Sequence, residues 1–341
     1  MTSAKKLLTV LGSAGYAKLP YSVDFTAQTD GALPNNWNGT AWAISSAKAI
    51  NTPTLSGTEL INNPGFEGTY SSGLAPNWTK YPAGTVVSES SDVHGGTAAQ
   101  YVGNATSNGG QVTSTNFALV AGDWVRCHGY YKVTGSAILR IQQGFGSYTV
   151  LQQVTLAGAD YTQNFMTAFI PESGNHGLSP GALNHATAET NNIIADDHST
   201  QKLTASTLSA VYDIQYRGVL KVRASMRVGI VGQPAGIIGW WDKDNLWQNM
   251  LIAYHDGETI KFEKLVGSVW TKLIGVTTAT YAADADIEIR RLTGTNTFQL
   301  WYNDSQVGAN QTISDTEIIN NKYFGLLSTG ESNSFDAFFL E

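Results

Sequence analysis

The chain contains few charged residues. Lysine, arginine, aspartate and glutamate make up 14% of its 341 residues, against roughly 25% in an average soluble protein. The net charge is −7, and no run of lysine or arginine is longer than two residues. This excludes the basic surface that nucleic acid binding needs. Threonine, serine, asparagine, glutamine and glycine must cover the surface, which suits exposed β-sheets and neutral, hydroxyl-rich partners.

Cysteine and long apolar runs are also scarce. Cys127 is the single cysteine, so an internal disulfide is excluded. It lies in the apolar run 124–131, where we expect it to be a small buried hydrophobic residue. No stretch approaches the roughly 20 apolar residues of a membrane-spanning helix. We therefore expect no membrane insertion.

The first residues resemble a secretory signal peptide. Lys5 and Lys6 precede a short apolar stretch, 7–11, and small residues follow it. This stretch is shorter than the roughly 7–15 apolar residues of a signal sequence. We interpret residues 1–18 as an extended arm that docks on a partner subunit, and a cleaved signal is the alternative.

Helical periodicity is nearly absent, and short strand-like runs recur between glycine, asparagine, aspartate and serine. The sequence predicts two hairpin turns, at 302–305 and 255–258. Many short strands with turn signals are typical of β-sandwiches and barrels. The length allows two domains, so we predict an all-β protein made of two antiparallel β-sandwiches.

The strands do not divide into two successive halves. Residues 20–52 hold too few strands to bury a core alone, a new module opens near Glu59, and it closes near Ser199. We predict a discontinuous outer sandwich, 19–55 plus 204–341, with a second sandwich, 56–203, inserted into it. Insertion is tolerated where the guest's ends lie close together. The strand 21–26 should then lie near the last strand, 335–340.

The inserted part carries several spaced motifs. They are Glu59-Leu60-Ile61-Asn62-Asn63-Pro64-Gly65-Phe66-Glu67, Trp78, Asp92-Val93-His94-Gly95-Gly96-Thr97-Ala98-Ala99 and Ile194-Ala195-Asp196-Asp197-His198-Ser199. With these motifs, residues 59–203 resemble a jelly-roll carbohydrate-binding module of the cellulose- and xylan-binding type. The resemblance implies a jelly-roll sandwich that binds glycans.

The outer part carries an opening motif and a closing motif. The first is Val23-Asp24-Phe25-Thr26 with Asp30-Gly31-Ala32-Leu33-Pro34-Asn35-Asn36-Trp37, and the second is Gly325-Leu326-Leu327-Ser328 with Ser334-Phe335-Asp336-Ala337-Phe338. These residues resemble the concanavalin/laminin-G-like sandwiches of tailed-phage structural proteins, although the arginine usual in the opening motif is missing.

Together the resemblances imply a non-enzymatic phage virion protein, a capsid decoration, head-fibre or tail-associated subunit in an extracellular particle. We expect it to contact other virion proteins through the arm, to form a homo-oligomer, and to adhere to glycans through many copies of a low-affinity site. A secreted bacterial carbohydrate-binding protein is the first alternative. A glycoside hydrolase or lyase on the concanavalin-like sandwich is the second.

Sugar recognition needs flat aromatic faces and fixed polar groups. Tyr130 and Tyr131 are adjacent, so on a strand one of them must face away from the core, and Tyr148 is a further candidate. The same alternation in 237–241 predicts that one of two adjacent tryptophans faces outward. We favour Trp240 as a ligand contact, with Trp247 at its rim; the alternative for each aromatic residue is packing in the core or at an edge.

A calcium site is expected in the inserted module. Glu67 lies near its start and Asp196 and Asp197 near its end, so adjacent ends would bring these carboxylates together. Calcium takes six to eight oxygen ligands, and in the family that residues 59–203 resemble such residues bind a structural calcium ion. The alternative is that these carboxylates only cap turns.

The predicted strand at 284–288 resembles a glycosidase motif. Asp284, Asp286 and Glu288 share one strand face, and retaining glycosidases need two carboxylates roughly 5–5.5 Å apart. The related pattern begins with glutamate, whereas this strand continues into Arg290 and Arg291. We interpret it as a solvated face on which Arg290 pairs with Glu288. The six histidines show no metal-binding spacing, and neither a Ser/His/Asp order nor a phosphate-binding glycine loop is recognisable, so we predict no catalytic residues.

Overall fold

The structure is a computed structural model that describes residues 16–17, 19–82, 85–103, 110–144, 149–182, 191–216, 218–244, 247–267 and 269–341. Nearly all regular structure is β. Helical segments among the described residues are short: α1 (Thr316–Ile319) and the 3₁₀ turns η1 (Phe25–Ala27) and η2 (Ala205–Thr207). The all-β prediction is confirmed. The predicted arm, 1–18, lies almost entirely outside the described residues.

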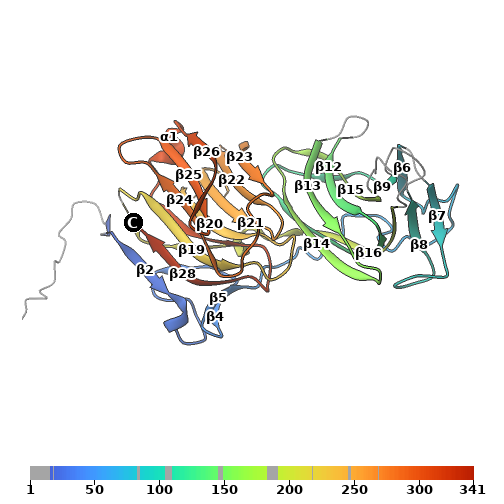
Figure 1. Cartoon of the computed structure of the whole chain (residues 1–341), viewed down its shortest axis with the longest axis horizontal. Coiled ribbons are helices and arrows are strands. Elements are labelled where there is room, and N and C mark those ends of the chain that lie inside the picture. Colours follow the sequence, from blue (N-terminus) through green and yellow to red (C-terminus); the bar gives the residue numbers. More distant parts are fainter. Residues whose placement is uncertain are drawn as a thin grey trace, which may run out of the picture.

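Four large antiparallel sheets form two sandwiches that lie side by side along the long axis (Figure 1). We call the first pair the outer sandwich. Its seven-stranded sheet has the order β23 (Val269–Val276), β22 (Ile260–Val266), β21 (Met250–His255), β20 (Ala235–Trp241), β27 (Tyr323–Ser328), β17 (Ser209–Tyr212), β3 (Trp37–Asn38). Its eight-stranded sheet has the order β26 (Ser305–Thr312), β25 (Thr297–Tyr302), β24 (Ala285–Arg291), β19 (Lys221–Arg227), β28 (Ser334–Leu340), β5 (Lys48–Asn51), β4 (Trp42–Ser45), with β2 (Tyr21–Asp24) on β28.

The second pair, which we call the inserted sandwich, is built from strands between residues 78 and 203. Its six-stranded sheet has the order β13 (Thr149–Leu156), β12 (Ala137–Gln143), β15 (Gly174–Ala182), β9 (Gly110–Ser114), β6 (Trp78–Pro82), with β10 (Phe117–Leu119) on β15. Its five-stranded sheet has the order β14 (Thr162–Phe169), β11 (Trp124–Thr134), β16 (Asn192–Leu203), β8 (Ala99–Gly103), β7 (Thr85–Glu89). A short parallel pair joins β1 (Tyr16–Ala17) to β18 (Gln215–Tyr216).

Local sequence explains several of these elements. Side chains of β25 alternate between half-buried and buried positions, the two-residue period of a strand with one buried face. Asn303 and Asp304 follow with φ angles of 46° and 61°, which suit a two-residue hairpin because asparagine and aspartate tolerate the left-handed region. Tyr302 pairs with Ser305 across this turn, so the predicted hairpin at 302–305 is confirmed.

The first strand of the outer sandwich pairs directly with the last strand of the chain. β2 runs antiparallel to β28, with Tyr21 opposite Leu340 and Asp24 opposite Ala337. The two connections to the inserted sandwich also run together, since the Ser56 N–H donates to the Lys202 carbonyl at 2.8 Å and Thr204 N–H to the Thr54 carbonyl at 2.8 Å. The prediction that the strand 21–26 lies near the last strand, 335–340, is confirmed.

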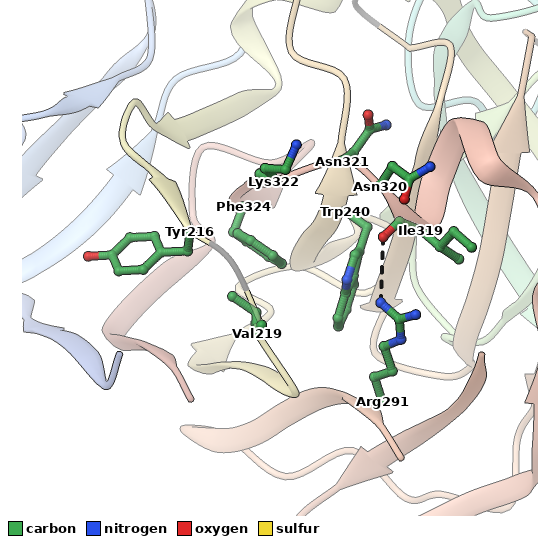
Figure 2. A pocket seen from close by; sticks show the side chains of 10 residues that line it. Tyr216, Val219, Trp240, Arg291, Ile319, Asn320, Asn321, Lys322 and Phe324 are labelled. Atoms are coloured by element: carbon green, nitrogen blue, oxygen red, sulfur yellow. Dashed lines mark hydrogen bonds between the residues drawn. The ribbon is translucent and has the colours of Figure 1, made fainter. Parts of the chain in front are cut away.

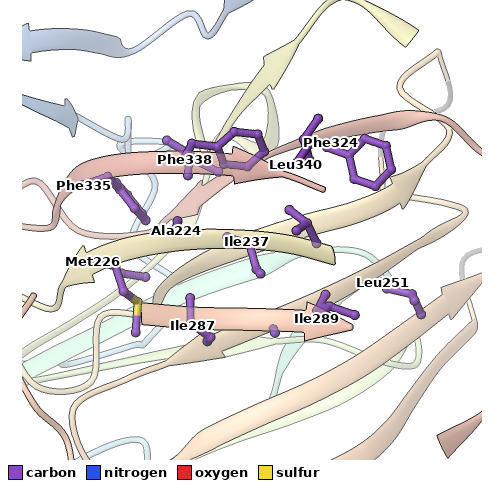
Figure 3. Packing of buried hydrophobic residues seen from close by; sticks show 14 of the residues in the cluster. Ala224, Met226, Ile237, Leu251, Ile287, Ile289, Phe324, Phe335, Phe338 and Leu340 are labelled. Carbon is purple, nitrogen blue, oxygen red and sulfur yellow. The ribbon is translucent and has the colours of Figure 1, made fainter. Parts of the chain in front are cut away.

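Each sandwich has its own apolar core. In the outer sandwich, side chains from both sheets interdigitate, among them Met226, Ile237, Ile287, Phe335 and Phe338 (Figure 3). The core of the inserted sandwich includes Cys127, which is fully buried as expected. Burial of this much apolar area is the main source of stability.

A third apolar cluster joins the two sandwiches, and we call it the junction. Trp124 and Phe169 come from the inserted sandwich, and they pack against Trp241, Trp247 and Tyr254 of the outer one. Backbone bonds cross the contact as well, for example Thr167 N–H to the Gly232 carbonyl at 2.7 Å. The seven-stranded sheet is therefore buried on both faces, one against its partner sheet and the other at the junction.

No helix in the described part of the chain is long and apolar enough to cross a membrane.

Candidate functional site

The prediction that one of the tryptophans in β20 faces outward is wrong. Trp240 and Trp241 are both 2% exposed. A bulge between Ile238 and Trp241 interrupts the alternation, and Trp240 adopts a φ of 47°. Trp240 consequently turns into the outer core, whereas Trp241 packs in the junction. The prediction assumed that the strand is regularly pleated and that only one face of its sheet is buried, and neither is the case.

Trp240 nevertheless borders a cavity of about 240 Å³. Figure 2 shows it between the turn before β27, the end of β24 and the segment after β18. We call it the Trp240 cavity. Its described lining residues are Tyr216, Gly218, Val219, Trp240, Arg291, Ile319, Asn320, Asn321, Lys322 and Phe324.

Aromatic packing fixes the apolar wall of the Trp240 cavity. The Trp240 ring meets Phe298 edge-on, with centroids 4.9 Å apart, and Phe324 at 5.3 Å. These contacts leave the indole one orientation, and Val219 and Ile319 extend the wall. Burial raises the pKa of Tyr216 far above its ordinary value, so its phenol stays neutral at physiological pH.

Arg291 is the best-anchored polar group of this cavity. Its Nε donates to the Thr295 carbonyl at 2.8 Å, and Nη2 donates to Asn296 Oδ1 at 2.6 Å. Nη1 points to the Ile319 carbonyl at 3.5 Å, the dashed line in Figure 2. The guanidinium plane is thus held by neutral acceptors.

Two asparagine side chains lie at the rim of the Trp240 cavity. Asn321 is fixed by donation from Nδ2 to the Glu317 carbonyl at 2.6 Å, and Asn320 is exposed. The described lining residues include two cations, Arg291 and Lys322, and no carboxylate. Such a cavity can bind hydroxyl or carboxylate oxygens against an apolar wall, and it lacks the paired carboxylates that glycoside hydrolysis needs.

The structure does not place Trp247 at the rim of this cavity. Trp247 is 4% exposed and packs in the junction, where its Nε1 donates to the Ala205 carbonyl at 3.3 Å. The prediction that it lines a ligand surface with Trp240 is wrong, because the inserted sandwich covers this region with Trp124.

The adjacent tyrosines of β11 do face opposite sides of their strand. Tyr131 is fully buried in the inserted core, so it offers no ring face to a sugar. Tyr130 lies on the outer face, half-buried, with the His94 ring stacked on it at 3.5 Å and 11°. Tyr148 lies outside the described residues.

The three predicted calcium ligands converge on one turn, 94–98. Glu67 Oε1 accepts from Thr97 N–H at 2.8 Å, and Asp196 Oδ2 accepts from His94 N–H at 2.9 Å. Asp197 Oδ2 lies 2.8 Å from His94 Nδ1. Within the described chain, no three histidine, cysteine, aspartate or glutamate side chains are arranged to hold a metal. The carboxylates thus fit the turn-capping alternative, while calcium binding stays a prediction.

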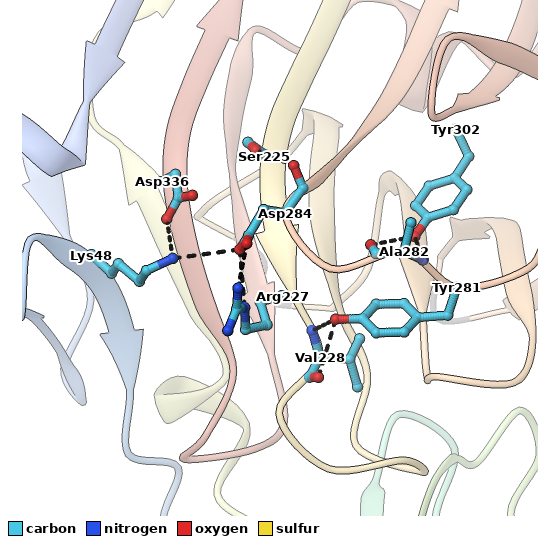
Figure 4. Close-up of polar contacts among 9 residues, drawn as sticks. All are labelled: Lys48, Ser225, Arg227, Val228, Tyr281, Ala282, Asp284, Tyr302 and Asp336. Atoms are coloured by element: carbon cyan, nitrogen blue, oxygen red, sulfur yellow. Dashed lines mark hydrogen bonds and ion pairs between the residues drawn. The ribbon is translucent and has the colours of Figure 1, made fainter.

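The acidic residues 284–288 are paired with cations. Asp284 contacts Arg227 and lies 3.4 Å from Lys48, which also pairs with Asp336 (Figure 4). Arg227 lowers the pKa of Asp284. This network ties β5 to β28 and to the start of β24, which is a structural role.

Further along the same strand, Arg290 Nε donates to Glu288 Oε2 at 2.6 Å, as predicted. Arg290 also lies over the Trp301 ring at 3.7 Å. The expectation that this face is solvated is wrong at Glu288, which is 2% exposed. The arginine and the indole cover the carboxylate, so it is not presented to a substrate.

Sequence reasoning missed most residues of the Trp240 cavity. Arg291 was interpreted only as the continuation of a strand, and Asn320, Asn321 and Lys322 were not singled out. The signal that could have found them is the polar turn between α1 and β27. It contributes three consecutive residues with amide or amine side chains.

The chain is similar to solved structures at low sequence identity. No protein-family model matches the sequence, and no curated protein does. Among solved structures, the tandem CBM22-1–CBM22-2 domain of Paenibacillus barcinonensis Xyn10C is 8% identical, covering 86% of this chain and 99% of that one with a TM-score of 0.33. The C-terminal family 22 carbohydrate-binding module of Clostridium thermocellum Xyn10B is 15% identical, covering 42% and 92% with a TM-score of 0.31.

A catalytic domain also matches. The endo-1,3-β-glucanase domain of Thermotoga petrophila is 10% identical, covering 43% of this chain and 70% of that one with a TM-score of 0.27. Similarity this low supports no argument about function.

Proposed function

We propose that this protein is a non-catalytic glycan-binding protein and that the Trp240 cavity is a glycan site. The observation that carries the proposal is the combination in one cavity of an aromatic wall with fixed amide and cationic groups. Sugar rings bind to such sites through C–H contacts with aromatic carbon and through hydroxyl hydrogen bonds. The cationic rim favours neutral or acidic sugars over basic ones.

The surface composition agrees with this proposal. With 14% charged residues, the chain presents mainly hydroxyl and amide groups, which exchange hydrogen bonds with sugar hydroxyls at little desolvation cost. The strand that resembles a glycosidase motif has its carboxylates paired with Arg227, Arg223 and Arg290. We therefore propose binding without hydrolysis.

A glycan array with the full chain tests the proposal. We expect binding of a defined set of neutral or acidic glycans, reduced by Asn320→Ala and abolished by Arg291→Gln. Asn310→Ala is the matched control, because Asn310 is also exposed but lies on β26 and does not line the cavity. Unchanged binding in both cavity variants, or no binding by the native chain, would exclude this site.

The setting that we propose is a phage virion, in which residues 1–18 contact another subunit and repeated copies raise the avidity. Support comes from the resemblance of the opening and closing motifs to phage structural proteins. A secreted bacterial carbohydrate-binding protein would carry the same cavity. Light scattering of the full chain and of a chain starting at residue 19 separates the two settings: an oligomer lost on truncation supports the virion arm, and a monomer in both supports the secreted protein.

A further inference from the structure

A second cavity, of about 250 Å³, lies between the two sandwiches beside the junction. β13 and the end of β14 form one side, and β21, β22 and β23 form the other. We call it the junction cavity. Its lining residues are Val150, Leu151, Gln152, Phe169, Pro171, Tyr254, Lys261, Glu263, Trp270 and Lys272.

The junction cavity has an aromatic wall. Trp270 is half-buried, and its ring stacks on Phe169 at 3.7 Å and 24°. Because Phe169 belongs to the inserted sandwich and Trp270 to the outer one, this stack exists only while the two sandwiches are in contact. The stack holds the indole rigidly beside the cavity, so packing of a ligand on the ring costs the protein little side-chain entropy.

Polar groups inside the cavity are buried and fixed. Glu263 is 5% exposed and accepts from the Tyr254 hydroxyl at 3.0 Å. Gln152 is 6% exposed; its Nε2 donates to Asp256 Oδ2 at 2.9 Å, and its Oε1 accepts from Lys261. Burial raises the pKa of Glu263. The charges of Lys261 and Lys272 oppose this rise, so both lysines lie close enough to act on the buried carboxylate.

The charges of the junction cavity select the chemistry of a ligand. Lys261 and Lys272 attract an anion and repel a cation, whereas Glu263 does the reverse, so a charge of either sign meets a repulsive group in this cavity. A neutral group rich in hydroxyls meets neither penalty, because it can donate to the carboxylate and accept from the ammonium groups. A ring with an apolar face would at the same time pack on Trp270.

We propose that the junction cavity is a second binding site, which takes one neutral pyranose unit with its face on Trp270 and its hydroxyls on Glu263 and Lys272. This site is separate from the Trp240 cavity and uses different residues. Since both sandwiches line it, a bound sugar also strengthens the contact between them.

Indole NMR signals test this proposal in the full chain. The nine tryptophans give separate side-chain N–H signals under ¹⁵N labelling, and Trp270→Phe identifies the relevant one. The probes are glucose, galactose, mannose and xylose, with glucosamine and galacturonic acid as charged counterparts. We expect at least one neutral sugar to shift the Trp270 signal in a saturable way, and the charged counterparts to bind more weakly.

Two variants assign the contacts. Glu263→Gln keeps the shape but removes a charge-assisted acceptor, so affinity should fall about tenfold or more. Lys272→Ala, at an exposed position, should weaken binding without affecting folding. No shift with any probe, or an affinity unchanged from that of the native chain in both variants, overturns the proposal. Arg291→Gln alters only the Trp240 cavity; a Trp270 shift that survives it separates this site from the proposed function.

Discussion

The buried histidine of the inserted sandwich gives the sharpest prediction. His198 is 4% exposed and is surrounded by the rings of Phe66, Trp78 and Tyr131, with centroids 5.1, 5.5 and 5.2 Å away. Neither ring nitrogen has a hydrogen-bond partner. Burial lowers the pKa of His198 to about 3 from the ordinary 6.5, because a charged imidazolium would lose its hydration there.

The sign of the pH effect follows from proton binding. Above pH 6.5 His198 is neutral in both the folded and the unfolded chain, and its contribution to stability is complete. As the pH falls below 6.5, the unfolded chain binds a proton that the folded chain rejects, so the free energy of unfolding decreases until the folded pKa is reached. From about pH 7.5 to about pH 5 the loss from this one group is about 2 kcal/mol.

The perturbation is His198→Leu, which keeps an apolar side chain of similar size and cannot titrate. Urea unfolding followed by tryptophan fluorescence measures the free energy of unfolding at both pH values. We expect the native chain to lose about 2 kcal/mol more than the variant over this range. Other buried histidines with lowered pKa, such as His255, contribute equally in both proteins and cancel in the difference.

Tyr131→Phe is the matched control. Tyr131 neighbours His198, is fully buried and has its pKa raised well above 10, so it carries no proton change between pH 5 and 7.5. The control should keep the pH dependence of the native chain. Equal losses in the native chain and His198→Leu, or a flattened dependence in Tyr131→Phe, would refute the reasoning.

Three further predictions concern the junction, a turn and the metal. Trp124→Ala should lower the free energy of unfolding by about 3–5 kcal/mol in urea titrations, since it empties a fully buried position; a change below about 1 kcal/mol would contradict the packing. Asp304→Val should lower the melting temperature, because a β-branched residue is strained at φ 61°, whereas Asp304→Gly should not. Calcium should raise the melting temperature of the native chain but not of Glu67→Gln, and no effect of chelator on the native chain would leave the carboxylates as turn caps.

Much of the fold was predictable from local patterns. The turn at 302–305 has residues that tolerate a positive φ, and the pairing of β2 with β28 followed from counting strands on each side of the insertion. The prediction that Tyr130 and Tyr131 face opposite sides of their strand was also confirmed, because β11 keeps its pleat at those two residues despite a bulge just before them. Short-range geometry determines each of these features.

The surfaces that we propose for binding were far less predictable. Trp240 and Trp241 were misjudged because one bulge changes the side-chain direction and because the second sandwich covers the outer face of the sheet. Trp247 was misjudged for the second reason. Neither a bulge nor a contact between sandwiches leaves a periodic trace in the sequence.

The cavities depend on segments that are distant along the chain. Trp270 meets Phe169 across about a hundred residues of sequence, and Arg291 reaches the turn at Ile319. Such contacts are set by tertiary packing, which composition and periodicity do not report. The scarcity of charge and the abundance of hydroxyl and amide groups indicated only the type of ligand that we propose.

Crystals of the full chain soaked with the strongest glycan from the array would test the central claim most directly. The account predicts an intact sugar in the Trp240 cavity, against the wall formed by Trp240 and Phe324 and within hydrogen-bond distance of Arg291. A glycan bound only elsewhere on the protein, or found cleaved, would contradict it.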